Sequence, residues 1–254
     1  MFDEVVQVTE NRKVNEEYWK LSFHSVKLSR GVKPGQFINI QLEDNYDPFL
    51  RRPFSYYRTA SGRIEILYEI LGRGTKLLTF KKKGDSLKVL GPLGKPFARN
   101  IGKKKRILIA GGVGVPPLVF LAEREPTDYL LIGCKSKGEV LPKKELSGIQ
   151  AKVCYATEEG SYGTKGFVTV LLHEIIQKEK NPKLLFLQTC GPHAMMLAVM
   201  KMAKEFGIEG EASIDERMAC GVGACLGCMV KTREGYKTSC VEGPVFQFND
   251  LLLD

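Results

Sequence analysis

The sequence contains no apolar run close to the ~18–20 residues that a membrane-spanning helix requires. Its first ten residues include Asp3 and Glu4 and lack the cationic and apolar segments of a secretory signal. The three histidines, His24, His173 and His193, are too scattered for a metal site or a catalytic triad. No paired-carboxylate arrangement stands out either. We therefore expect a cytoplasmic protein with no membrane partner, whose chemistry does not come from its own acid–base side chains.

Charge is distributed unevenly along the chain. The formal net charge is +9, yet residues 211–254 hold 4 Lys/Arg against 7 Asp/Glu, so the basic excess lies within residues 1–210. A basic protein can bind nucleic acid. However, no aromatic residues are interleaved with the lysine runs at 81–83 and 103–105, which are typical of solvated turns. We therefore predict that nucleic acid is not a partner.

Residues 1–100 have the pattern of a small antiparallel β-barrel. The chain is 43% hydrophobic, as expected for a globular protein, and is long enough for two domains and a small appendage. Short apolar segments at 37–42, 64–68 and 87–90 are separated by turns rich in Gly and Pro. Several short strands at this spacing favour a barrel.

The pattern changes after residue 100, where predicted strands and helices alternate. This alternation predicts a parallel sheet with helices on its faces over residues 101–210. From about residue 211 the chain is rich in Cys and Gly and too short for a large core, so a metal centre would supply its cohesion. The predicted strands cover 106–110, 129–134, 151–156 and 184–188, and the predicted helices cover 118–122, 168–177 and 192–206.

Four of the seven cysteines cluster near the C-terminus, which is the strongest signal in the sequence. Cys220, Cys225, Cys228 and Cys240 have the spacing C-x4-C-x2-C-x11-C. Three closely spaced cysteines with a fourth further on are typical of plant-type [2Fe–2S] sites. The small residues between them allow backbone amides to point at the sulfurs. Zinc sites more often pair two C-x2-C units, but a zinc knuckle without a redox role remains the alternative.

Two predicted strands end in glycine-containing turns that open helices. The first turn contains Gly111, Gly112 and Gly114, and the second is Cys190-Gly191-Pro192. Glycine allows a phosphate to approach the backbone closely, and neighbouring strand ends form the usual crevice of a parallel sheet. The first turn lacks the Lys-Ser/Thr ending of a P-loop. Together the two turns favour a dinucleotide site, with tight structural turns as the alternative.

Two further motifs lie in the predicted barrel. Arg51-Arg52-Pro53-Phe54-Ser55 suits flavin binding, because an arginine can pair with a pyrophosphate while backbone and Ser55 contact the ring. Gly72-Arg73-Gly74-Thr75 offers further amides and a hydroxyl to phosphate. Without other context, a surface turn before a strand is the favoured interpretation of the first motif, and a simple turn explains the second motif equally well.

The order of these motifs resembles that of the electron-transfer subunits of class 1B dihydroorotate dehydrogenases, which are members of the ferredoxin-reductase superfamily. The resemblance covers nearly the whole chain. One departure is Ser213-Ile214-Asp215, where the family more often has Ser-Leu-Glu. The motifs that carry the resemblance are Arg-Pro-Phe-Ser at 52–55, Gly-Arg-Gly-Thr at 72–75, Gly-Pro-Leu-Gly at 91–94, AGGVGVPPL at 110–118, Cys-Gly-Pro at 190–192 and MACGVGACLGC at 218–228.

This resemblance implies three domains: a flavin-binding β-barrel (1–100), a nucleotide-binding α/β domain (101–210) and a small [2Fe–2S] domain (211–254). It implies that Cys220, Cys225, Cys228 and Cys240 bind the cluster. The implied FAD contacts are Arg52, Pro53, Phe54, Ser55, Leu67, Tyr68, Glu69, Gly74 and Thr75. The implied nicotinamide crevice consists of Gly111, Gly112, Gly114, Cys190, Gly191 and Pro192.

The implied activity is an electron relay. Electrons would pass from NADH to FAD, then to the [2Fe–2S] cluster, and then to the FMN of a dihydroorotate dehydrogenase catalytic subunit in a two-plus-two heterotetramer. The cofactors would carry the chemistry, which explains the lack of an acid–base constellation. Two alternatives remain. One is a related flavin and iron–sulfur subunit of a sulfide dehydrogenase, a hydrogenase or an NADPH:ferredoxin oxidoreductase. The other is a non-redox, zinc-stabilised nucleotide-binding module.

Overall fold

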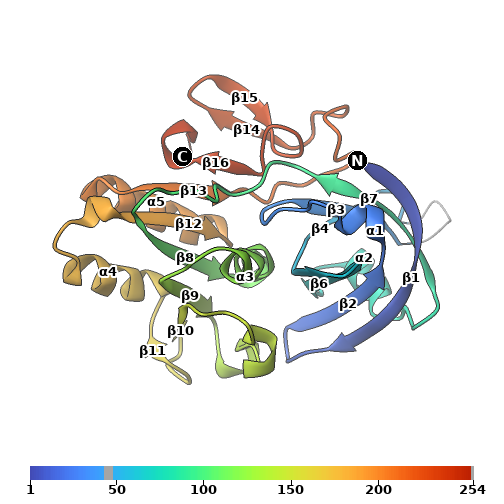
Figure 1. Cartoon of the computed structure of the whole chain (residues 1–254), viewed down its shortest axis with the longest axis horizontal. Coiled ribbons are helices and arrows are strands. Elements are labelled where there is room, and N and C mark those ends of the chain that lie inside the picture. Colours follow the sequence, from blue (N-terminus) through green and yellow to red (C-terminus); the bar gives the residue numbers. More distant parts are fainter. Residues whose placement is uncertain (43–47, 253–254) are drawn as a thin grey trace.

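A computed structural model describes residues 1–42 and 48–252 of the chain. Within these residues it contains two seven-stranded sheets and a two-stranded hairpin (Figure 1). The first sheet forms one end of the molecule, and the second sheet with its helices forms the other. The hairpin lies along the side of both, so the cysteine-rich segment contacts each sheet.

The first sheet is antiparallel and strongly curved, and it confirms the barrel prediction. Its apolar face encloses a core that includes Leu21, Ile38 and Ile40. The Phe54 and Tyr68 rings meet edge to face at 5.9 Å, which brings together β4 and β6 from separate parts of the sheet. In spatial order the strands are β4 (Arg52–Ser55), β3 (Phe37–Gln41), β7 (Ser86–Leu93), β1 (Phe2–Lys13), β2 (Tyr18–His24), β6 (Arg63–Glu69) and β5 (Arg58–Ala60).

The second sheet is parallel except at one edge, which confirms the α/β prediction. The exception is the last strand, which comes from the cysteine-rich segment and pairs antiparallel with its neighbour. That segment therefore continues the nucleotide-domain sheet as well as contacting the barrel. In spatial order the strands are β11 (Thr164–Lys165), β10 (Lys152–Thr157), β9 (Tyr129–Cys134), β8 (Lys105–Gly111), β12 (Leu185–Cys190), β13 (Glu209–Ser213) and β16 (Val245–Gln247).

Helix α3 (Val115–Arg124) lies between the two sheets (Figure 1). Pro116 and Pro117 fit its first turn, where the missing N–H groups cost little. Its Phe120 belongs to the barrel core, whereas Val119 belongs to the nucleotide-domain core. The barrel and the parallel sheet therefore share one helix, which fixes their relative placement.

Two longer helices cover the parallel sheet. They are α4 (Val168–Lys178) and α5 (His193–Phe206), close to the predicted ranges. Gly207 ends α5 in the left-handed conformation, with φ of 64°. The short helices are α1 (Val26–Ser29), α2 (Arg73–Leu78), η1 (Gly112–Gly114), η2 (Lys137–Glu139), η3 (Lys143–Leu146), η4 (Pro182–Leu184) and η5 (Phe248–Asp250).

The cysteine-rich segment forms the hairpin β14 (Met229–Thr232) and β15 (Gly235–Thr238) together with irregular loops. Cys228 and Cys240 pack with Phe37 and Leu93 of the barrel in a small apolar cluster. Among the described residues, no helix is both long and apolar enough to span a membrane.

Candidate functional site

A cavity of about 800 Å³ lies where the barrel, the parallel sheet and the cysteine-rich segment meet. The structure brings all nine sequence-predicted flavin residues to the wall of this one cavity. They come from β4, from the end of β6 and from the start of α2, all within residues 52–75. The nine are Arg52, Pro53, Phe54, Ser55, Leu67, Tyr68, Glu69, Gly74 and Thr75.

The two barrel motifs are built into regular elements that contact each other at the cavity wall. Residues 52–55 form strand β4, and residues 73–75 form the first turn of α2. A Cβ at Gly74 would lie 2.9 Å from Nε of Arg52, so the glycine leaves room for the arginine side chain. The Thr75 hydroxyl accepts hydrogen bonds from the Leu71 and Gly72 amides at 2.9 and 3.2 Å, which fixes the entry to α2.

Glu69 is a buried acid at the boundary between the barrel and the nucleotide domain. Only 7% exposed, it has no hydrogen-bond partner for Oε1 within the described residues. That oxygen lies 3.4 Å from where a Cβ of Gly112 would sit. Burial and the negative charge of Glu17 raise the pKa of Glu69 to about 7, although the nearby Tyr18 hydroxyl opposes the shift. Tyr18 donates its hydroxyl proton to the Gly112 carbonyl at 2.9 Å.

The two glycine-containing turns lie against each other at the ends of the adjacent strands β8 and β12. A Cβ at Gly114 would lie 2.0 Å from the Cys190 carbonyl oxygen, so only glycine fits there. A Cβ at Gly191 would lie 2.8 Å from the Gly111 oxygen. Cys190 lines the cavity, together with Val113 and Pro116 of the first turn. The other five predicted residues of the crevice, Gly111, Gly112, Gly114, Gly191 and Pro192, are not among the cavity-lining residues.

Residues 215–218 form a further part of the cavity wall that the sequence did not predict. They follow β13 at the same sheet edge as the ends of β8 and β12, and that position in a parallel sheet was the available signal. Asp215 is open to solvent in the cavity, yet surrounding protein and the neighbouring Glu216 raise its pKa. The wall therefore contains acidic groups from both sheets.

The four predicted cluster ligands lie in the cysteine-rich segment beside the barrel. Cys225 is exposed, whereas Cys228 and Cys240 are 2% and 1% exposed. In residues 1–42 and 48–252, no three His, Cys, Asp or Glu side chains have the geometry to hold a metal ion. The ligand assignment thus stays a prediction from spacing and thiol chemistry.

Backbone amides already point at two of these sulfurs. The Sγ of Cys220 accepts hydrogen bonds from the amides of Val222 and Cys225, both at 3.4 Å, and the Sγ of Cys240 accepts one from Gly223 at 3.2 Å. Burial acts to raise the pKa of Cys220, but the amides outweigh it and lower the pKa to about 6. The segment therefore favours a thiolate at Cys220, which is the form that binds metal.

Comparison with known proteins places this arrangement in a family. Residues 215–252 match the model of the iron–sulfur cluster binding domain of dihydroorotate dehydrogenase B. The electron transfer subunit of dihydroorotate dehydrogenase B (NAD⁺) from Caldanaerobacter subterraneus is 36% identical, with 97% of each chain covered. The corresponding subunit from Desulforamulus reducens is 36% identical, with 89% of each covered. The chain belongs to this family of electron transfer subunits.

Solved structures support the same fold for this family member. An NADH-dependent reduced ferredoxin-NADP oxidoreductase superposes with a TM-score of 0.85 at 27% identity, covering 99% of this chain and 91% of that one. The ferredoxin reductase of carbazole 1,9a-dioxygenase superposes with a TM-score of 0.70 at 20% identity, covering 82% of this chain and 66% of that one. The second similarity is evidence for the fold alone.

Proposed function

We propose that this chain takes electrons from NADH and passes them through FAD and a [2Fe–2S] cluster to the FMN of a dihydroorotate dehydrogenase catalytic subunit. One observation carries the proposal. The predicted flavin residues, Cys190 of the nucleotide crevice and residues 215–218 of the cluster segment all line a single cavity. A flavin held there would contact both the electron donor's site and the segment that leads to the cluster.

The cavity residues suit FAD in size and chemistry. Its ~800 Å³ volume is typical of cofactor pockets, and the wall combines apolar rings with a few polar groups. Arg52 would pair with the pyrophosphate, while β4 and residues 67–69 would hold the ring. Bound FAD accepts two electrons as hydride and releases them one at a time. The protein would hold the cofactor in place and orient it.

NADH would bind across the ends of β8 and β12. In the sheet order, β9 lies on one side of β8 and β12 on the other, so this is the point where connections change direction. Gly111, Gly112 and Gly114 would present backbone to the phosphates, and Gly191 and Pro192 would line the opposite side. Cys190, which reaches the flavin cavity, would lie beside the nicotinamide.

The four thiols suit a [2Fe–2S] cluster rather than a harder metal, since thiolates select soft metals. Cys220, Cys225, Cys228 and Cys240 would bind it, with amides of residues 222–225 as hydrogen-bond donors to the sulfurs. Exposure of Cys225 would bring one edge of the cluster close to the partner.

We assign the partner as an FMN-containing catalytic subunit in a two-plus-two heterotetramer. Seven free thiols suit a reducing compartment, so we place the protein in the cytoplasm. The hypothesis that the chain serves a ferredoxin oxidoreductase is weaker. The sequence is 27% identical to the ferredoxin-NADP oxidoreductase but 36% identical to the dihydroorotate dehydrogenase subunits. The zinc reading is disfavoured by the match to an iron–sulfur domain model.

The deciding experiment is a cofactor and activity assay on the chain co-expressed with its catalytic partner. We expect one FAD, two irons and two sulfides per chain, together with orotate-dependent oxidation of NADH. Light scattering would report the mass of the assembly, and NADPH would serve as the comparison substrate. A colourless protein containing zinc, or electron delivery only to a ferredoxin, would contradict the proposal.

A further inference from the structure

Asn39 is a polar residue at a completely buried position of the barrel. It lies in β3 opposite Pro53 of the flavin-lining strand β4, and its exposure is 0%. Its neighbours Ile38 and Ile40 face the barrel core. Because side chains alternate along a strand, Asn39 faces the other way, as does Phe37, which packs with Cys228 and Cys240. Asn39 therefore points towards the cysteine-rich segment.

The Asn39 amide contacts the backbone of the first predicted cluster ligand. Nδ2 of Asn39 lies 3.4 Å from the Cys220 carbonyl oxygen and donates to it. Gly221 has a positive φ of 72°, and a Cβ there would lie 2.1 Å from the same Nδ2. Glycine is thus required at 221 on two grounds: the left-handed backbone and the space that Asn39 occupies.

The other half of the Asn39 amide is unsatisfied. Its Oδ1 is buried and has no hydrogen-bond partner among the described residues. A buried polar atom without a partner destabilises the fold. An apolar residue would therefore suit the barrel better, so the benefit of asparagine must come from its contact with the cysteine loop.

We propose that Asn39 is a positioning residue that holds the Cys220–Gly221 peptide, and through it the cluster-binding loop, against the flavin-binding barrel. The inference rests on the proposed function, because it takes Cys220 as a cluster ligand. Holding that peptide orients the amides of Val222 and Cys225, which donate to the Cys220 sulfur. Hydrogen bonds to the sulfurs stabilise the more negative, reduced cluster. Asn39 thus sets both the reduction potential and the distance from the flavin-lining strand.

The test is Asn39→Ala in the intact complex with its catalytic partner. We expect FAD content to be unchanged, the reduction potential of the cluster to become more negative, and its electron paramagnetic resonance spectrum to shift. Electron transfer from NADH to the partner's FMN should slow about 10-fold, as is typical when a group supporting a metal ligand is removed. Loss of the cluster with FAD retained would support the same role.

A second variant and a control separate positioning from folding. Gly221→Ala introduces a methyl group at the Asn39 amide, so it should shift the spectrum in the same way with Asn39 present. Gln36→Ala removes a similar bond, from Nε2 to the Gly94 carbonyl at 3.0 Å, and should leave the spectrum and potential unchanged. A wild-type spectrum and potential in both Asn39→Ala and Gly221→Ala would overturn the inference while leaving the proposed function intact. Absence of iron and sulfide from the wild-type chain would instead overturn the proposed function.

Discussion

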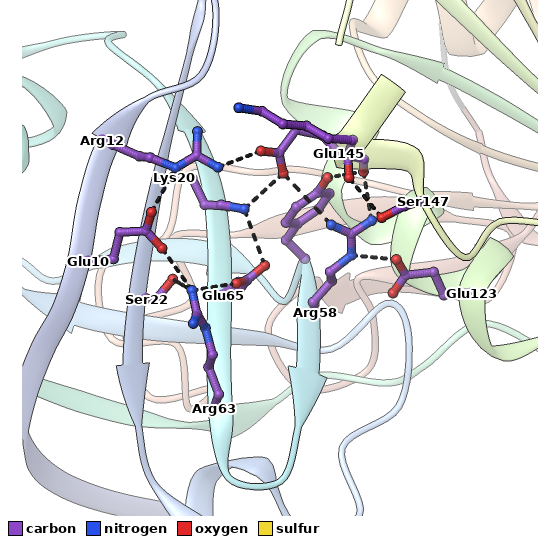
Figure 2. A network of polar contacts seen from close by, with 12 residues as sticks. Glu10, Arg12, Lys20, Ser22, Arg58, Arg63, Glu65, Glu123, Glu145 and Ser147 are labelled. Atoms are coloured by element: carbon purple, nitrogen blue, oxygen red, sulfur yellow. Dashed lines mark hydrogen bonds and ion pairs between the residues drawn. The ribbon is translucent and has the colours of Figure 1, made fainter. Parts of the chain in front are cut away.

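The barrel meets the rest of the chain at two junctions of opposite character. Its junction with the nucleotide domain is rich in buried charge, centred on Glu145 (Figure 2). Its junction with the cysteine-rich segment consists mainly of apolar side chains and backbone. There Phe37 and Leu93 pack on two cysteines, and the Lys95 amide donates to the Gly243 carbonyl at 2.5 Å.

At the charged junction, one acid from the nucleotide domain binds cations from three barrel strands. The Glu145 carboxylate accepts from Arg12 at 2.6 Å and from Lys20 at 2.9 Å, and its side chain is 2% exposed. Arg58 donates to the Glu145 carbonyl at 2.7 Å and pairs with Glu123 of helix α3. Every partner in this network is a side chain or backbone group of the chain itself.

The difference shows which junction depends on a cofactor. At the charged junction each cation has an acidic partner within the described residues, so ion pairs can hold the flavin and nucleotide sites in register. The cysteine junction contains four free thiols and an unsatisfied Asn39 oxygen. Its small apolar cluster offers little area, so we expect its cohesion to come from the metal centre.

The largest effect should come from Cys228→Ser. Removing this buried thiol should abolish the cluster, because serine is a poor ligand for iron–sulfur centres. The charged junction should survive, so FAD should remain near one per chain. Iron, sulfide and flavin analysis of the purified complex measures both outcomes.

The matched control for this prediction is Cys154→Ser. Cys154 is a half-buried thiol in β10 of the nucleotide domain, outside the cysteine-rich segment. We expect its replacement to leave iron, sulfide and FAD unchanged. Full iron content in Cys228→Ser would remove Cys228 from the ligand set, and concurrent loss of FAD would show that the two junctions are not independent.

Glu145→Gln should have the next largest effect, on the stability of the charged junction. Burial acts to raise the pKa of Glu145, but hydrogen bonds from Lys20 and Arg12 outweigh it and lower the pKa. The acid is therefore ionised, and neutralising it leaves the buried Lys20 ammonium with only Glu65, at 3.7 Å, as an acidic partner. Breaking a buried ion pair in this way costs about 3–5 kcal/mol. Urea unfolding of the two proteins measures the difference.

Glu174→Gln is the control for the charged junction. Glu174 forms an exposed i,i+4 pair with Lys178 at 3.8 Å, and such pairs contribute less than about 1 kcal/mol. Cluster content should stay unchanged in both variants, since neither residue touches the cysteine-rich segment. Equal unfolding midpoints for Glu145→Gln and Glu174→Gln would remove the distinction we draw between the junctions.

The contrast between the two junctions also explains which features could be predicted from the sequence. Local periodicity predicted the strand at 129–134 and the helix at 168–177, because both patterns are complete within a short window. The flavin residues of the cavity wall were implied by the family resemblance, and residues 67–69 carry no motif of their own. The contacts at the two junctions could not be predicted, because the residues that form them are distant in the sequence. Arg12 and Glu145 are 133 residues apart, and Asn39 and Cys220 are 181 apart. Nothing local to Glu145 or Asn39 distinguishes it from an ordinary surface residue.

Arg52→Ala tests the cofactor site that lies between the two junctions, separately from the contacts of either junction. Arg52 borders the flavin cavity but contributes to neither contact set. Losing a charge-assisted hydrogen bond to a phosphate costs about 1.5–3 kcal/mol, or roughly 10- to 100-fold in FAD affinity. Flavin retention during dialysis measures this, and neither the cluster content nor the unfolding midpoint of the FAD-free protein should change. Unaltered FAD affinity would exclude the proposed pyrophosphate contact.

The smallest effect concerns Glu69, a second buried acid at the boundary of barrel and nucleotide domain. Whereas cations lower the pKa of Glu145, burial and Glu17 raise that of Glu69 to about 7. An unfolded glutamate titrates near pH 4.3. Between about pH 4.3 and 7 the folded chain therefore binds more protons than the unfolded chain, and its stability falls as pH rises. Glu145 contributes with the opposite sign, losing stability only as pH falls below the unfolded value.

Glu69→Gln should therefore remove part of the pH dependence between pH 5 and 8 without changing stability at pH 5. Because the cavity admits solvent, we expect a difference of about 1 kcal/mol across this window. Unfolding midpoints of the FAD-free protein and the FAD-free variant, measured at several pH values, give the result. Subtracting the two curves cancels titrations that both proteins share. A constant difference between the curves would mean that Glu69 stays ionised when folded, and that the two acids of this junction behave alike.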